Sequence, residues 1–158
     1  MPKIELEIEI NAPIELVFDL SRSIDLHQLS THQTNEKAIS GKTKGLLELN
    51  DSVTWRAKHF GIYQNLTSKI TRYDRPNFFT DEMQKGAFKE FQHEHFFTKK
   101  EQSTIVRDVF KFKSPLGFLG LLANKLFLEN YMRNFLIDRN LAIKKCAESN
   151  QWREILKG

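Results

Sequence analysis

The feature that most constrains this chain is the shortness of the connections between its β-type segments. β-Branched and aromatic residues concentrate in five segments, at about 52–60, 62–73, 77–84, 88–98 and 103–113. Glycine, asparagine, aspartate and proline punctuate these segments, and only a few residues join one segment to the next. Connections this short can join antiparallel neighbours but not parallel ones, which need a crossover of about a dozen residues. The segments therefore predict an antiparallel meander.

Two strands and two short helices are predicted before the meander. Residues Lys3–Ile10 alternate aliphatic and charged side chains, which is typical of a half-buried strand. Asn11 is a candidate helix N-cap, followed by a proline and by apolar spacing that indicates a short helix at 14–20. A second short helix is predicted at 24–30, and a further strand at about 36–40.

A long helix is predicted at the C-terminal end of the chain. Residues 117–148 contain no proline, and their polar and apolar side chains separate onto two faces at helical spacing. The apolar face is expected to lie on the sheet. The start of this segment, 117–128, is apolar nearly all round, which indicates deep burial, a lid over a cavity, or a contact surface. Residues 149–158 are interpreted as a frayed extension.

The composition indicates one cytoplasmic domain. A chain of 158 residues with 40% apolar content can bury a core without metal or disulfide. The lone Cys146 cannot form an internal disulfide, and its apolar neighbours indicate packing in a reducing compartment. Charges of both signs are spread along the chain, so a nucleic-acid partner is not expected. Neither a signal peptide nor stable membrane insertion is expected, and no feature indicates an oligomeric state.

Three stretches of the chain carry a family likeness. They are residues 51–71 (DSVTWRAKHFGIYQNLTSKIT), 75–97 (RPNFFTDEMQKGAFKEFQHEHFF) and 107–120 (RDVFKFKSPLGFLG). They resemble the bacterial ligand-binding proteins of the SRPBCC superfamily, which includes START lipid-transfer domains and the birch-pollen allergen. The resemblance implies a single α+β domain over 1–158 with the helix-grip fold. In that fold a curved antiparallel sheet of about seven strands wraps around a long C-terminal helix, in the order β-α-α-β6-α.

The last hairpin of the meander supplies most of the candidate site. If its turn centres between Lys100 and Glu101, the facing pairs are Phe97 with Thr104, His95 with Val106, His93 with Asp108, and Phe91 with Phe110. Aromatic rings, both histidines and the aspartate then share one face, which we assign to the concave side of the sheet. The opposite face carries charged residues, as solvent exposure requires.

Polar groups on this apolar face are expected to pair, because an unpaired one costs about 1–3 kcal/mol. A hydrogen bond between His93 and Asp108 would fix the imidazole tautomer and raise the pKa of His93, which makes these two residues the catalytic candidates. The alternative interpretation is a structural pair that fixes the strand register.

The ligand-binding candidates come from three parts of the predicted fold. Arg139 interrupts the apolar stripe of the final helix, so we expect it to reach the cavity rim or to pair with an acid near the cavity mouth. The full set also includes one face of the 52–60 strand and the hairpin face: Trp55, His59, Phe91, His93, His95, Asp108, Phe110 and Arg139. His59, His93, His95 and Asp108 are potential metal ligands, but no metal-binding spacing such as His-Glu-x-x-His appears, so neither a metal nor another cofactor is expected.

Binding of a small apolar or amphipathic molecule in an internal cavity, without catalysis, is the function expected first. One alternative is a cyclase- or dehydratase-like enzyme in which the His93–Asp108 pair moves protons on a carbonyl substrate. Another is a regulatory module that docks through the apolar start of the final helix. The resemblance does not decide among them, since one fold hosts many functions.

Overall fold

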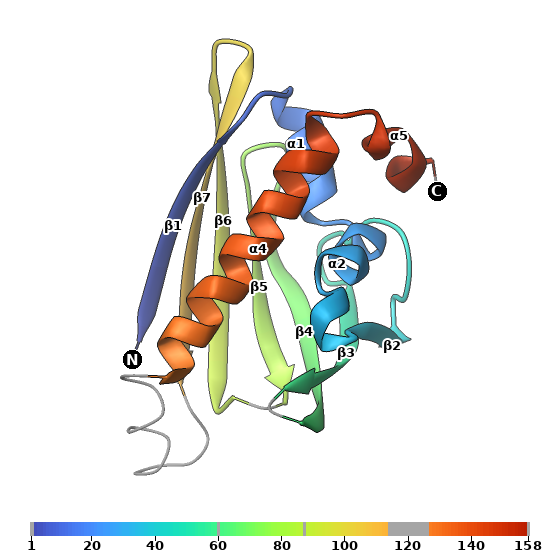
Figure 1. Ribbon diagram of the computed structural model, residues 1–158, viewed down its shortest axis with the longest axis vertical. Coiled ribbons are helices and arrows are strands. Elements are labelled where there is room, and N and C mark those ends of the chain that lie inside the picture. The colour runs from blue at the N-terminus through green and yellow to red at the C-terminus, as the bar shows by residue number, and fades with distance from the viewer. Residues whose placement is uncertain (1, 60, 87, 114–126, 158) are drawn as a thin grey trace.

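A seven-stranded antiparallel sheet forms the frame of the protein, with the strands in the order β1-β7-β6-β5-β4-β3-β2. The structure is a computed structural model that describes residues 2–59, 61–86, 88–113 and 127–157 (Figure 1). From β2 onward each strand pairs with the next along the chain, which confirms the predicted meander. The strands are β1 Lys3–Ile10, β2 Lys37–Gly41, β3 Ser52–His59, β4 Ile62–Asp74, β5 Phe78–Lys85, β6 Glu90–Lys100 and β7 Ser103–Lys113.

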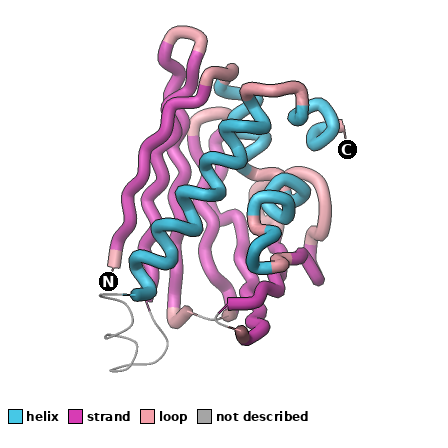
Figure 2. The backbone as a smooth tube through the Cα atoms, viewed as in Figure 1, coloured by secondary structure: helices cyan, strands magenta, loops and turns pink. Residues whose placement is uncertain are grey.

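Helices α1, α2 and α4 lie against the sheet, and α4 crosses one face of it diagonally (Figure 2). In its course α4 contacts α1, α2 and β1. The helical elements are α1 Ile14–Ser21, α2 Ile24–Ser30, the 3₁₀ turn η1 His32–Thr34, α4 Glu129–Ala147 and α5 Gln151–Leu156. No helix among these described residues is long and apolar enough to cross a membrane.

The start of α1 differs from the prediction. Pro13 occupies the N-cap position and no side chain caps the helix. Asn11, the predicted cap, lies outside the helix and donates its backbone N–H to Glu148 Oε2 at 2.8 Å. Because proline fixes its own φ in the range a helix start requires, α1 can begin without a capping side chain. In α2 the usual cap is present, since the Ser23 hydroxyl accepts from the Leu26 N–H.

The end of the chain also differs from the prediction. Instead of a frayed extension over 149–158, the structure has a helix, α5, over Gln151–Leu156. Trp152, Ile155 and Leu156 pack against the core cluster that contains Ile143 and Cys146. Partial burial of these apolar side chains holds the short helix in place. Of the apolar start predicted for the long helix, 117–128, residues 117–126 lie outside the described residues.

The hairpin between β6 and β7 is formed one residue later than predicted. Its turn centres between Glu101 and Gln102, because Lys100 pairs with Ser103. Glu101 has a φ of 57°, which permits this two-residue turn. The predicted partners are therefore wrong by two residues: Phe91 faces Phe112, His93 faces Phe110, His95 faces Asp108 and Phe97 faces Val106. A shift of two residues keeps every side chain on the same face, so the predicted concave face is unchanged.

Three buried clusters form the core. The first joins α1, the sheet and α4, with the Phe18 ring 5.1–5.5 Å from the rings of Tyr73, Phe79 and Phe97. The second contains Ile4, Phe110, Phe112 and Leu136, and the third contains Ile24, Val53 and Trp55. The three clusters surround the candidate site, which draws wall residues from each of them.

Candidate functional site

A pocket of about 620 Å³ lies between the sheet and the helices α2 and α4. Strands β3 to β7 supply its sheet wall, and residues on both sides of the start of α4 supply much of the opposite wall. Most of its surface is apolar. The apolar lining comprises Leu47, Trp55, Ala57, Leu66, Ile70, Phe79, Phe88, Phe91, Phe110, Phe127, Leu128, Met132, Phe135 and Leu136.

The structure places most of the candidate binding residues on this pocket wall. The lining residues predicted from sequence are Trp55, His59, Phe91, His93, His95, Phe110 and Arg139. Asp108 is not among the lining residues: only 1% of its surface is exposed, and it lies behind the two histidines. Asp108 can therefore act on a bound molecule only through the side chains in front of it.

Four titratable side chains from three adjacent strands form a cluster at the sheet wall: Asp81 on β5, His93 and His95 on β6, and Asp108 on β7. His93 Nε2 lies 3.0 Å from Asp108 Oδ1, and His95 Nε2 lies 2.8 Å from Asp81 Oδ1. His95 Nδ1 is 2.9 Å from the same Asp108 oxygen, at an angle too bent for a hydrogen bond. Asn140 on α4 donates Nδ2 to Asp108 Oδ2 at 2.8 Å.

The charges of this cluster follow from its contacts. Burial opposes ionisation of Asp108, but the hydrogen bond from His93 and the close approach and charge of His95 outweigh it and hold the pKa of Asp108 well below its usual range. The pKa of Asp81 is also lowered, since hydrogen bonding to His95 outweighs the effect of burial. Burial lowers the pKa of His95, yet its two carboxylate neighbours outweigh that effect and raise it. His95 is therefore favoured as an imidazolium between two carboxylates.

The pKa of His93 is shifted in the direction opposite to the prediction. Burial is the largest cause and the charge of His95 is the second, and together they lower the pKa of His93 to about 4 despite the bond to Asp108. The prediction of a raised pKa considered Asp108 alone and missed His95, whose ring centroid is 3.8 Å away. An ionised carboxylate can only accept hydrogen bonds, so the proton of neutral His93 is on Nε2. Nδ1 then carries a lone pair and has no hydrogen-bond partner among the described residues.

Arg139 is placed differently from the prediction. Its side chain is 7% exposed, so it does not reach out to the rim. It donates Nη2 to the Ser21 carbonyl at 2.9 Å and Nη1 to Asn140 Oδ1 at 3.3 Å, and both acceptors are neutral. Within the described residues no carboxylate lies in ion-pair contact with it. The predicted acid partner is thus replaced by backbone and amide oxygens, which leaves a buried cation on the pocket wall.

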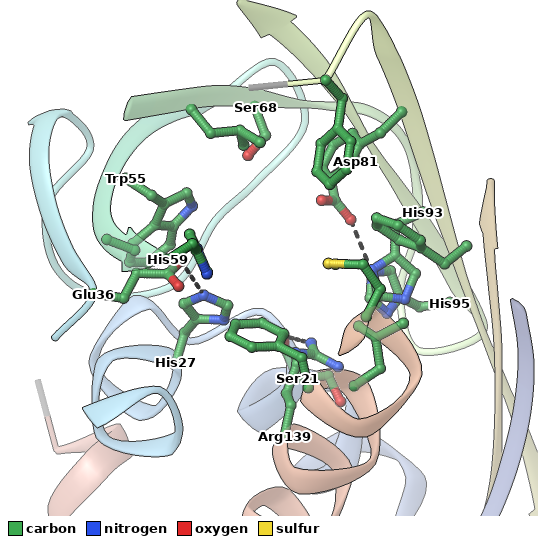
Figure 3. Close-up of a pocket in the computed structure, with 18 of the residues that line it drawn as sticks. Ser21, His27, Glu36, Trp55, His59, Ser68, Asp81, His93, His95 and Arg139 are labelled. Carbon is green, nitrogen blue, oxygen red and sulfur yellow. Dashed lines mark hydrogen bonds and ion pairs between the residues drawn. The ribbon is translucent and has the colours of Figure 1, made fainter. Parts of the chain in front are cut away.

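A second polar group lies across the pocket from the Asp81–His93–His95 side (Figure 3). His27 Nε2 lies 2.8 Å from Glu36 Oε1, and the His27 ring packs 4.3 Å from the Trp55 ring. His59 Nδ1 hydrogen bonds to the Tyr131 hydroxyl, and burial lowers the pKa of His59. These contacts give the pocket a polar group on each of two opposite sides, with aromatic and aliphatic surface between them.

Sequence reasoning missed Asp81, His27, Glu36 and Tyr131. A signal for Asp81 was present, because it follows Phe79 at a spacing of two and therefore shares the concave face. Its position opposite His93 depends on the β5–β6 register, which no sequence pattern fixed. The other three lie on α2, near η1 and on α4, so only the packing of helices against the sheet brings them to the pocket.

Comparisons with known proteins identify the fold. No protein-family model and no curated protein matches the chain. Among solved structures, the protein TTHA0849 from Thermus thermophilus has a TM-score of 0.76 at 16% identity, over 94% of this chain and 100% of that one. Major latex-like protein 151 from Panax ginseng has a TM-score of 0.68 at 14% identity, covering 94% of this chain and 98% of its own.

A START superfamily protein from Mycobacterium smegmatis gives a TM-score of 0.68 at 12% identity, over 92% of this chain and 97% of that one. At these identities the similarity is one of fold. The chain has the helix-grip α+β fold of the START and latex-like proteins, which is the fold that the sequence resemblance implied.

Proposed function

We propose that the protein binds a small amphipathic molecule in the pocket between the sheet and α4. The observation that carries this proposal is the pocket itself, whose volume of about 620 Å³ and largely apolar lining suit a small organic ligand. Sites for such ligands typically enclose about 300–1,000 Å³ and present few polar groups. The resemblance to START lipid-transfer domains supports the same kind of role.

The polar end of the ligand is proposed to be anionic. Arg139 is a buried cation whose bonded acceptors are neutral, and a buried charge is far more stable beside an opposite charge. A carboxylate on the ligand would supply that charge through a charge-assisted hydrogen bond. The aromatic wall formed by Phe88, Phe91 and Phe110 would then receive the apolar part of the molecule.

Binding is favoured over proton-transfer catalysis by the state of His93. With a pKa of about 4, this imidazole is a weak base at neutral pH, far from the matched pKa that efficient general-base catalysis needs. Asp108 is separated from the pocket by the histidines, so its charge serves to hold them in place. The cyclase- or dehydratase-like alternative has no comparable observation in its favour.

Fatty acids and the alcohols of the same chain length provide the test. A saturating acid at about 100 times its Kd should stabilise the protein by about 2.7 kcal/mol, or a rise in melting temperature of about 5–10 °C for a domain of this size. Arg139→Gln should weaken binding of the acid and leave binding of the alcohol nearly unchanged. If neither series raises the melting temperature nor appears in native mass spectra, the proposed function is wrong.

A further inference from the structure

A group of possible metal ligands lies on the pocket wall: a nitrogen of His93, a nitrogen of His95 and a carboxylate oxygen of Asp81 lie within 4.8 Å of one another. Asp81 pairs directly with His93 across β5 and β6, and His95 is two residues further along the same face. The group therefore comes from two strands that pair without a bulge. Two imidazoles and one carboxylate are a donor set typical of divalent transition metals and not of Mg²⁺ or Ca²⁺.

One carboxylate lies against the side of each imidazole that faces away from the pocket. His93 Nε2 and His95 Nδ1 both face Asp108 Oδ1, at 3.0 and 2.9 Å. Asn140 Nδ2 holds the second oxygen of Asp108 at 2.8 Å. In metal sites the histidine nitrogen that does not bind the ion is commonly held by a carboxylate, which fixes the ring orientation and raises its basicity. Here a single buried aspartate holds the His93 ring by a hydrogen bond and lies in close contact with the His95 ring.

The ring nitrogens that do not face Asp108, His93 Nδ1 and His95 Nε2, are the ones suited to metal coordination. His93 is 5% exposed, lines the pocket, and has at Nδ1 a lone pair without a hydrogen-bond partner among the described residues. His95 Nε2 already contacts Asp81 Oδ1 at 2.8 Å. We propose that His93 Nδ1, His95 Nε2 and the Asp81 carboxylate bind a divalent first-row transition-metal ion, with Asp108 as the positioning residue.

The three side chains are close enough together to share one ion. Ligands of a tetrahedral ion with bonds of about 2.1 Å lie about 3.4 Å apart, and one ligand atom from each side chain already lies within 4.8 Å of the other two. The Asp81 side chain is 19% exposed and belongs to the residue that pairs directly with His93 across the two strands. His95 gives up its Nε2 proton to solvent when the ion binds, as metal coordination requires. Three protein ligands leave at least one coordination position open to the pocket.

The proposal is independent of the proposed function and is tested without any organic ligand. Untagged protein is first treated with a chelator to remove bound metal. Binding of Co²⁺ is then measured by visible absorption and binding of Zn²⁺ by calorimetry, with Mg²⁺ as the control ion. We expect saturable binding of one Co²⁺ or Zn²⁺ ion per chain and none of Mg²⁺. Asp81→Asn, which removes a ligand at a half-buried position, should weaken binding strongly, and the exposed Asp138→Asn on α4 should leave it unchanged.

The positioning role has its own readout. Asp108→Asn should weaken Co²⁺ binding about 10- to 100-fold, the range typical of residues that hold a metal ligand in place, and should alter the visible spectrum because the rings reorient. Circular dichroism checks that each variant is folded. Lack of saturable binding to the folded wild-type protein, or equal affinity for wild type and Asp81→Asn, would overturn the proposal. Fatty-acid binding measured in chelator would be unaffected by either outcome.

Discussion

Replacing Asp108 with asparagine should destabilise the protein by about 3 kcal/mol at neutral pH. The carboxylate contacts His93, His95 and Asn140 at 2.8–3.0 Å while only 1% exposed. Asparagine keeps one accepting oxygen but turns an N–H₂ towards a ring N–H or the Asn140 amide, and it removes the charge beside His95. Hydrogen bonds to charged groups contribute about 1.5–3 kcal/mol each, so the loss exceeds the roughly 1 kcal/mol of a single ordinary pair.

Urea denaturation of chelator-treated protein, followed by both circular dichroism and tryptophan fluorescence, measures this difference. Coincident curves establish two-state unfolding, and the midpoint then gives the change in free energy at constant slope. Asp138→Asn is the matched control and should lie within about 0.5 kcal/mol of wild type, as surface substitutions usually do. Asn140→Ala removes the donor to Asp108 and the long hydrogen bond from Arg139, and should cost about 1–2 kcal/mol. The prediction is wrong if the change in free energy of unfolding for Asp108→Asn equals that of the control within error. It is also wrong if Asn140→Ala loses more stability than Asp108→Asn.

Three other perturbations have expected outcomes. Phe112→Ala removes a fully buried ring outside the pocket lining and should cost about 3–5 kcal/mol of stability. Phe91→Ala removes a half-buried ring on the pocket wall and should cost no more than about half of that. Equal losses in urea denaturation would mean that side chains fill the pocket. Asp19→Asn should cost about 2 kcal/mol at pH 7, because Asp19 hydrogen bonds to Arg22 and Arg75. Burial opposes ionisation of Asp19, but these bonds outweigh it and lower the pKa of Asp19. The difference in free energy of unfolding between Asp19→Asn and wild type should therefore be constant above about pH 4 and shrink as the pH falls through the folded-state pKa. A difference that grows in acid would contradict this sign. Trp152→Ala should cost about 1–2 kcal/mol by removing the largest ring of α5 from the core, and no loss on thermal unfolding would show that α5 does not stabilise the domain.

The sheet was predictable from sequence because local patterns determine it. The alternation in β1 and the short connections after β3 fix strand positions to within two residues and fix the antiparallel order. The β6–β7 register was not predictable, since it depends on whether Glu101 adopts a positive φ, and glutamate gives no signal of that. The residues predicted for the concave face were still correct, because the predicted register was wrong by two residues and only an odd shift turns side chains to the other face.

The candidate site was only partly predictable, for a different reason. His93, His95 and Asp108 could be placed together because they share one hairpin. Asp81 required the pairing of a separate strand, and Arg139 required knowledge of how α4 lies on the sheet. The pKa of His93 depends on burial and on a second histidine, so a pairwise rule applied to His93 and Asp108 gave the wrong direction. The periodicity of a sequence predicts single strands and helices, but not a pKa or a side-chain position that depends on how three or more of them pack together.

The pairing of β1 with β7 affects how the chain can fold during synthesis. The paired residues, from Lys3 with Lys111 to Ile10 with Thr104, are about 100 residues apart along the chain. At roughly 5–20 residues per second, a ribosome needs about 5–20 s after β1 to produce its partner strand. During that interval β1 has an unpaired backbone, and Ile4 and Ile10, buried in the finished protein, have no core to enter. The charged residues that alternate with them keep the nascent strand hydrated and oppose its pairing with other chains.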